Sequence, residues 1–258
     1  MFLQEKPLDN PVTDGGFCSI FRTIGCIGDS LSSGEHESQI DGKTGFHDYY
    51  EYSWGQFIAR AAGSTVYNFS CGGLTAKGFL SADWLDFHNP DKVCQAYIIA
   101  LGVNDINTGV ELGSADDIHP ENSDLNADTF AGDMGRIMSQ IKQKQPKARV
   151  FLMTMPRHEW SNDDPNDKSN RHAQLMYEIA EKFEFTYVID LRKYGPVYDE
   201  EFRKNYYLGW HLNAMGYLLT AKMVMCYIDY IVRNNMADFA QIGFVGRGND
   251  LHNEKAVW

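Results

Sequence analysis

The chain has 258 residues and carries 35 acidic side chains against 23 basic ones, a formal net charge of −12, with 43% hydrophobic residues. A folded chain of this length buries roughly 70 to 75% of the surface of its extended form, so its core needs no disulfide or metal ion to hold it together. The negative charge excludes nucleic acids and anionic membranes as expected partners, because both attract clusters of lysine and arginine.

The N-terminus and the cysteines are typical of a cytoplasmic protein. The first residues contain Glu5, Asp9 and two prolines, where a secretory signal has a basic start and an uninterrupted apolar stretch. The cysteines are odd in number and form no C-x-x-C pair, which predicts reduced, structural thiols. They are Cys18, Cys26, Cys71, Cys94 and Cys226.

Five short apolar runs, each bounded by Gly, Pro, Asn or Asp, predict β-strands. Their hydrophobicity is continuous rather than alternating, which is typical of strands covered on both faces in a parallel sheet. In chain order they are Phe21 to Ile27, Val66 to Phe69, Tyr97 to Leu101, Val150 to Met153 and Tyr187 to Ile189.

Amphipathic patterns between these runs predict helices, because apolar residues recur three and four positions apart. These helices lie around Ser53 to Ala62, Ala127 to Lys144 and Ser169 to Phe183. The last apolar segment, Leu212 to Val232, contains Lys222 and Asp229. Each of these charges would cost about 2.5 to 3.5 kcal/mol near a bilayer centre, so we interpret the segment as a buried helix.

The alternation of strands and helices predicts an α/β fold, a three-layer αβα sandwich around a flavodoxin-like parallel sheet of about five strands. We expect one domain over residues 19–236, with extensions at 1–18 and 237–258 whose periodicity is weak. These extensions pack either on the domain or on a second copy of the chain, and a homo-oligomer is left open. Functional residues are expected just after the strands, where ligands bind in such sheets.

The segment after the first predicted strand reads Gly28-Asp29-Ser30. A serine placed where a strand turns into a helix exposes its hydroxyl at the sheet edge, and its backbone N–H can point at an incoming carbonyl oxygen. The same tripeptide is also ordinary turn chemistry, because Asp and Ser bond to nearby backbone groups. Ser30 is therefore a candidate nucleophile whose support must come from the other loops.

Three later loops carry residues suited to the same chemistry. Gly73 follows the second predicted strand, Asn104 follows the third, and His211 stands just ahead of the last helix. A glycine lets a backbone N–H approach a ligand closely, and an asparagine side chain offers two amide donors. With Ser30, these residues fall on four separate loops at one end of the proposed sheet.

In this order the four segments resemble the four blocks of the SGNH (GDSL-type) hydrolases, over Thr23 to about Ile231. Each block is short, but their order, their placement after strands and their spacing make the resemblance specific. The blocks are Gly28-Asp29-Ser30, Gly73, Gly102-Val103-Asn104-Asp105 and His211-Leu212-Asn213.

The resemblance implies a serine esterase. Ser30 would be the nucleophile, and His211 the base that takes its proton and returns it to the leaving alcohol. The oxyanion hole would consist of the backbone N–H groups of Ser30 and Gly73 and the side-chain amide of Asn104, and losing one such donor typically costs about 100- to 1,000-fold in rate. Gly73 is preferred to Gly72 because its position matches the family's spacing.

One position departs from the family. An acid usually stands three residues before the histidine, and here that residue is Leu208. We expect the main-chain carbonyl of Leu208 to accept the Nδ1–H of His211, which gives a Ser-His dyad. Two alternatives stay open: an acid from earlier in the chain folds back to His211, or the enzyme is inactive and the fold serves for binding. The candidate acids are Asp199, Glu200 and Glu201.

Three further residues are candidates for the pocket. Asp29 is expected to brace the nucleophile turn, and Asp105 to cap a helix or brace a loop. His158 follows the fourth strand and would replace His211 as the base if His211 pointed elsewhere. We expect no metal site, because one nearby group of acids and imidazoles lacks a recognisable ligand spacing. That group is Glu35, His36, His47 and Asp48.

From the resemblance we expect the enzyme to cleave a carbohydrate O-acetyl group or a short acyl ester through an acyl-enzyme on Ser30, without a metal or organic cofactor. Its partner would be a small-molecule or carbohydrate ester. Two alternatives stay open. One is a catalytically silent ligand-binding protein of the same fold, and the other is an acyltransferase in which an alcohol takes the place of water.

Overall fold

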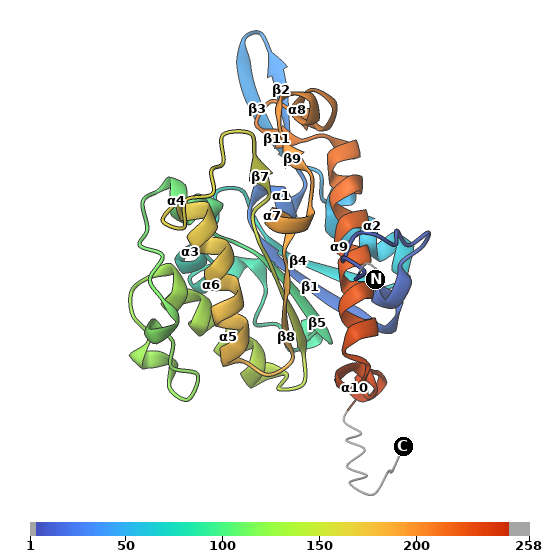
Figure 1. Ribbon diagram of the computed structural model, residues 1–258, viewed down its shortest axis with the longest axis vertical. Coiled ribbons are helices and arrows are strands. Elements are labelled where there is room, and N and C mark those ends of the chain that lie inside the picture. The colour runs from blue at the N-terminus through green and yellow to red at the C-terminus, as the bar shows by residue number, and fades with distance from the viewer. Residues whose placement is uncertain (1–3, 248–258) are drawn as a thin grey trace, which may run out of the picture.

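The computed structural model describes residues 4–247, which form the predicted three-layer α/β fold around one parallel sheet (Figure 1). Its strand order is β4-β1-β5-β6-β8, the flavodoxin-like order. The strands are β1 Thr23–Gly28, β4 Thr65–Ser70, β5 Ala96–Ala100, β6 Arg149–Met153 and β8 Thr186–Ile189. The fold class and the five-stranded sheet are therefore confirmed.

Strand β1 lies inside the sheet, between β4 and β5, and this position places its last residue at the site. Gly28, its last residue, pairs with Ser70 of β4 on one side and with Ala100 of β5 on the other. The three strands therefore end side by side. The loops that follow them are forced to meet at one edge of the sheet, which is where parallel sheets bind ligands.

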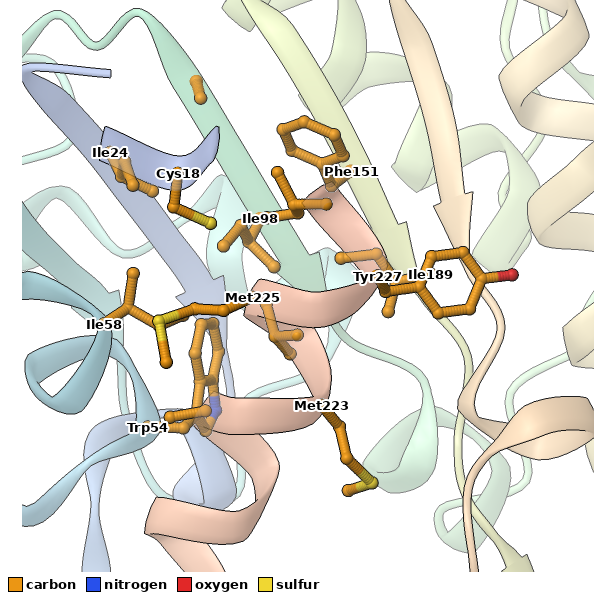
Figure 2. Close-up of a cluster of buried hydrophobic side chains, with 14 of the residues drawn as sticks. Cys18, Ile24, Trp54, Ile58, Ile98, Phe151, Ile189, Met223, Met225 and Tyr227 are labelled. Carbon is orange, nitrogen blue, oxygen red and sulfur yellow. The ribbon is translucent and has the colours of Figure 1, made fainter. Parts of the chain in front are cut away.

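Helices cover both faces of the sheet, which explains why its strands are apolar on both sides. Figure 1 shows α2 and α9 on one face and α3, α5 and α6 on the other. The bounds are α2 Trp54–Ala62, α3 Ala76–Leu80, α5 Phe130–Lys144, α6 Lys168–Lys182 and α9 Ala214–Asn234. Figure 2 shows the core between α9 and the sheet, where Trp54, Ile98 and Met225 pack together.

Five short helices follow strands or end the fold. They are α1 Ser30–Ser33, α4 Val103–Asn107, α7 Leu191–Tyr194, α8 Glu200–Tyr206 and α10 Met236–Phe239. The first two begin directly after β1 and β5, so the turns that carry Ser30 and Asn104 lie at the carboxyl edge of the sheet.

By length and composition α9 resembles a membrane-spanning helix, but 67% of its most apolar window is buried inside the protein. Lys222 is exposed, and Asp229 accepts a hydrogen bond of 2.8 Å from Arg233. The helix is thus the core helix that the two charges predicted.

Three two-stranded ribbons lie outside the predicted pattern. They are β2 Glu35–Ile40 with β3 Lys43–Asp48, β7 Arg157–His158 with β9 Val197–Tyr198, and β10 Tyr207–Leu208 with β11 His211–Leu212. The β2–β3 hairpin projects beyond the sheet (Figure 1). Its turn has positive φ at Asp41 (52°) and Gly42 (74°), the conformation that Asp-Gly favours in tight hairpins.

The described parts of both extensions pack on the domain. At the N-terminal end, Cys18 is fully buried and Glu5 forms an ion pair of 2.6 Å with Arg233 of α9. At the C-terminal end, Phe239 and Val245 belong to the same core cluster as α9. Residues 248–258 lie outside the described part of the chain.

Candidate functional site

The nucleophile turn is built by the capping of α1. Asp29 is its N-cap and accepts a hydrogen bond of 3.1 Å from the backbone N–H of Leu31. Burial raises the pKa of Asp29 to about 7, as expected for a carboxyl group removed from water. Ser30 is the first residue of the helix, so its backbone N–H is one of those that the helix itself leaves free.

The predicted oxyanion donors lie on neighbouring loops. Gly73 has a φ of 74°, which a residue with a side chain rarely adopts. The amide Nδ2 of Asn104 donates to the carbonyl oxygen of Leu74 at 3.2 Å and lies 3.5 Å from an oxygen of Asp29. Asn104 thus links the loop after β4 to the nucleophile turn.

His211 lies on β11, which contacts both α1 and β2. Two residues later, Asn213 is the N-cap of α9, and its side chain accepts from the backbone N–H groups of Met215 and Gly216 at 3.0 Å each. The segment His211-Leu212-Asn213 therefore contains both the predicted base and the N-cap of α9. Only 14% of the His211 side chain is exposed.

The Nδ1 atom of His211 lies 2.7 Å from Oε1 of Glu37, a residue that the sequence reasoning missed. The same oxygen accepts the backbone N–H of Trp210 at 2.6 Å. An ionised carboxylate can only accept, so Nδ1 of His211 carries a proton and, in the neutral form of the ring, Nε2 is the atom that can take another. Glu37 thus orients the imidazole of His211 from its Nδ1 side.

This contact corrects the expectation for Leu208. Its carbonyl does not orient His211, because the Nδ1–H already donates to Glu37. Asp199 does not fold back either, since it caps α8 and accepts from the N–H of Phe202 at 2.8 Å. The signal that could have found Glu37 is the Asp-Gly turn, which folds residues 35–48 into a hairpin.

Gly209 makes room for the acid. A Cβ at this position would lie 2.0 Å from Oε2 of Glu37, and its φ of 70° is also unfavourable for other residues. The Gly-Trp-His segment therefore fits around the Glu37 carboxylate, of which only 4% is exposed.

A second carboxylate faces the other nitrogen of the imidazole. Oε1 of Glu35 lies 3.1 Å from Nε2 of His211. Burial raises the pKa of Glu35; His211 acts in the opposite direction, and the nearby charges of Asp48 and Glu37 raise it further. Among the described residues no hydrogen bond joins Ser30 Oγ to His211, so Glu35 stands where the nucleophile would have to approach.

The acids and imidazoles of the hairpin make other contacts. His36 Nδ1 is 2.8 Å from the Gly34 carbonyl, and His47 Nε2 is 2.8 Å from the Ser38 hydroxyl. Asp48 accepts from Ser33 Oγ at 2.6 Å. Within residues 4–247 no group of three or more His, Cys, Asp or Glu side chains is arranged to hold a metal ion.

A cavity of about 100 Å³ lies against the nucleophile turn. Three of its lining residues, Leu31, Val103 and Leu212, each adjoin a predicted catalytic residue in the sequence. Most of the lining is apolar, but three lining residues each have a buried polar atom without a hydrogen-bond partner: Ser32 Oγ, Trp54 Nε1 and His158 Nδ1. Unpaired buried polar groups are costly, so the cavity suits bound water or a ligand with polar atoms.

Of the remaining pocket candidates, two line the cavity and one is buried in the core. Asp29 and His158 line the cavity. His158 stacks on Trp160 with ring centroids 4.7 Å apart, and burial lowers its pKa. Asp105 does not line the cavity: it is fully buried and accepts from the backbone N–H of Ala76 at 3.1 Å.

Comparisons with known proteins agree with this arrangement. The sequence profile of the GDSL-like lipase/acylhydrolase family matches residues 26–219, most of the chain. No curated protein matches the sequence.

Solved esterases share the fold at low sequence identity. A family two carbohydrate esterase from Clostridium thermocellum, in complex with cellohexaose, is 15% identical with a TM-score of 0.59, over 92% of this chain and 67% of that chain. The acetyl xylan esterase AlAXEase is 16% identical with a TM-score of 0.51, over 78% of this chain and 97% of that chain. The psychrotrophic esterase EstA from Pseudoalteromonas sp., inhibited by monoethylphosphonate, is 16% identical with a TM-score of 0.54, over 83% of this chain and 100% of that chain.

The profile covers Ser30, Gly73, Asn104 and His211, and the neighbours have the same sheet and layers. The chain therefore belongs to the GDSL-like lipase/acylhydrolase family and is an SGNH-type esterase.

Proposed function

We propose that the enzyme removes short acyl groups, acetyl above all, from carbohydrate hydroxyls through an acyl-enzyme on Ser30. The observation that carries the proposal is the 2.7 Å contact between His211 Nδ1 and Glu37, because a base with a fixed tautomer can activate a serine on the adjacent turn. The silent-binder alternative depended on the lack of a group to orient His211, and Glu37 removes that argument.

In the first half of the reaction, Ser30 Oγ attacks the ester carbonyl carbon and its proton passes to Nε2 of His211. The carbonyl oxygen becomes an oxyanion, held by the N–H groups of Ser30 and Gly73 and by the Asn104 amide. When the C–O bond breaks, the leaving alkoxide takes the proton from Nε2. Glu37 stays ionised throughout and stabilises the imidazolium that forms between the two proton transfers.

In the second half, water gives a proton to Nε2 and its oxygen attacks the acyl carbon. The bond to Ser30 Oγ then breaks, and the proton returns from His211 to Ser30 as the carboxylic acid leaves. An alcohol in place of this water would make the same enzyme an acyltransferase. No contact within residues 4–247 favours that outcome over hydrolysis.

The cavity beside the turn is the candidate site for the acyl group. Its volume of about 100 Å³ is smaller than the roughly 150 Å³ that accommodate benzene. The acyl groups that fit are therefore short. The carbohydrate half of the proposal is supported by the carbohydrate esterase and the acetyl xylan esterase among the structural neighbours.

The proposal is tested by labelling and by a substrate screen. A fluorophosphonate should add mass to a peptide containing Ser30, and Ser30→Ala should remove both the label and hydrolysis of 4-nitrophenyl acetate. A screen of acetylated sugars with added alcohol acceptors then separates hydrolysis from acyl transfer. A folded enzyme that neither takes the label nor cleaves any acetyl ester would refute the proposal.

A further inference from the structure

Glu35 and Glu37 belong to one strand but face opposite nitrogens of the same imidazole. Glu37 lies at Nδ1 (2.7 Å) and Glu35 at Nε2 (3.1 Å). In the proposed reaction, Nε2 must give its proton to the oxygen of the leaving alcohol, which requires a separation of about 2.7 to 3.2 Å. An oxygen of Glu35 thus already lies at the distance from Nε2 that the leaving-group oxygen needs.

The neighbouring backbone is shaped for the Glu35 carboxylate. A Cβ at Gly72 would lie 2.3 Å from its Oε2, so this glycine makes room for the acid while Gly73 carries the oxyanion N–H. The main chain of Glu35 is held separately, because its carbonyl accepts the hydroxyl of Tyr217 at 2.6 Å. Rotation about the side-chain bonds alone can therefore move the carboxylate away from His211.

Among the described residues, the one ion pair of Glu35 is with His211, and it exists only when the imidazole is protonated. Among residues 4–247 no lysine or arginine forms an ion pair with it, and 13% of its side chain is exposed. The groups that face it are His211 from β11, Glu37 from its own strand and Asp48 from β3. A half-buried carboxylate beside two others costs stability, which makes a purely structural role unfavourable.

Two exposed aromatic side chains lie next to His211, one in space and one in sequence. Phe46 is 59% exposed and its ring packs edge-on against His211, with centroids 5.9 Å apart. Trp210, the residue before His211, is 85% exposed. Aromatic rings beside a carboxylate can contact both the C–H face and the hydroxyls of a sugar, because the rings are apolar bodies and the carboxylate is an acceptor.

We propose that Glu35 is a specificity-determining residue for the leaving group. In the free enzyme it closes the site by facing Nε2 of His211. In the complex it turns aside and accepts a hydrogen bond from a hydroxyl next to the scissile ester of a sugar, whose ring lies against Phe46 and Trp210. This inference rests on the proposed function and assigns the sugar to the leaving-group side.

The test compares two acetyl esters that differ in the leaving group. One is 4-nitrophenyl acetate, which has no hydroxyl, and the other is a monoacetylated methyl β-xylopyranoside. Glu35→Ala should raise kcat/KM for the aryl ester severalfold, because the closing carboxylate is gone. The ratio of kcat/KM for the glycoside to kcat/KM for the aryl ester should fall by about 10- to 150-fold, the range for a hydrogen bond to a charged group.

Two controls accompany this comparison. Glu121→Gln changes an acid whose side chain is 71% exposed, and it should alter neither rate. Glu35→Gln keeps an acceptor without the charge and should lower the glycoside rate less than Glu35→Ala does. Equal loss on both esters would mean that Glu35 only positions His211, and no change on either would mean that it has no role. Both results overturn the inference.

A binding experiment separates this inference from the proposed function. In a Ser30→Ala background, calorimetry measures the affinity for the acetylated glycoside without turnover. Adding Glu35→Ala should weaken binding at least tenfold if Glu35 holds a sugar hydroxyl, whatever the reaction. Unchanged affinity would refute the inference even if Ser30 proves to be the nucleophile.

Discussion

Replacement of Glu37 is the most direct test of the triad. Its Oε1 serves two donors, His211 Nδ1 at 2.7 Å and Trp210 N at 2.6 Å. Glu37→Gln keeps an acceptor but removes the charge that stabilises the imidazolium. A hydrogen bond to a charged group contributes about 1.5 to 3 kcal/mol, so kcat/KM should fall by about 10- to 150-fold.

Glu37→Ala should be more severe, because it also frees the imidazole to rotate and leaves the Trp210 N–H unpaired. We expect a fall of about 1,000- to 10,000-fold, as for other triads that lose their acid. Hydrolysis of 4-nitrophenyl acetate measures both variants, and thermal unfolding shows that they are folded. Leu208→Ala, which keeps the backbone carbonyl, should stay near the wild-type rate. A folded Glu37→Ala enzyme within threefold of wild type would refute the triad.

Three further outcomes are expected. Gly72→Ala should push the Glu35 carboxylate off His211, since its Cβ would lie 2.3 Å from Oε2, and should raise aryl acetate hydrolysis as Glu35→Ala does. In a series of 4-nitrophenyl esters, kcat/KM should fall sharply beyond about four acyl carbons, because the cavity holds about 100 Å³. Burial lowers the pKa of His172 from an ordinary value near 6.5 to about 4. As the pH falls from 6.5 to 4, the unfolded chain therefore takes up this proton before the folded protein does, and the free energy of unfolding decreases. As the pH is lowered from 7 to 4.5, the melting temperature of His172→Gln should therefore approach or exceed that of wild type. Asp29 and Asp105, whose raised pKa values act in the opposite direction, are common to both proteins and cancel in the difference.

The sheet could be predicted because a strand that is buried on both faces has a continuous run of apolar residues. Each strand is a continuous apolar run, and each of the motif loops follows a strand or precedes a core helix. The β2–β3 hairpin lacks a continuous apolar run, because its strands are polar and largely exposed. The Asp41-Gly42 turn was its one local signal.

The site was predictable as far as it depends on position along the chain. Ser30, Gly73 and Asn104 lie at strand ends, so topology alone brings their loops together. Glu37 reaches His211 across 174 residues from a hairpin outside the sheet, and no periodicity reports such a contact. The expectation for Leu208 was wrong because it sought the missing acid, or its substitute, only near the histidine in sequence.

The origin of Glu37 on the strand that follows the nucleophile bears on how relatives are classified. Surveys that judge catalytic competence by the residue three places before the histidine would discard this chain as a degenerate copy. Inspecting the first hairpin after the serine as well would recover chains in which a carboxylate reaches the histidine from a segment distant in sequence.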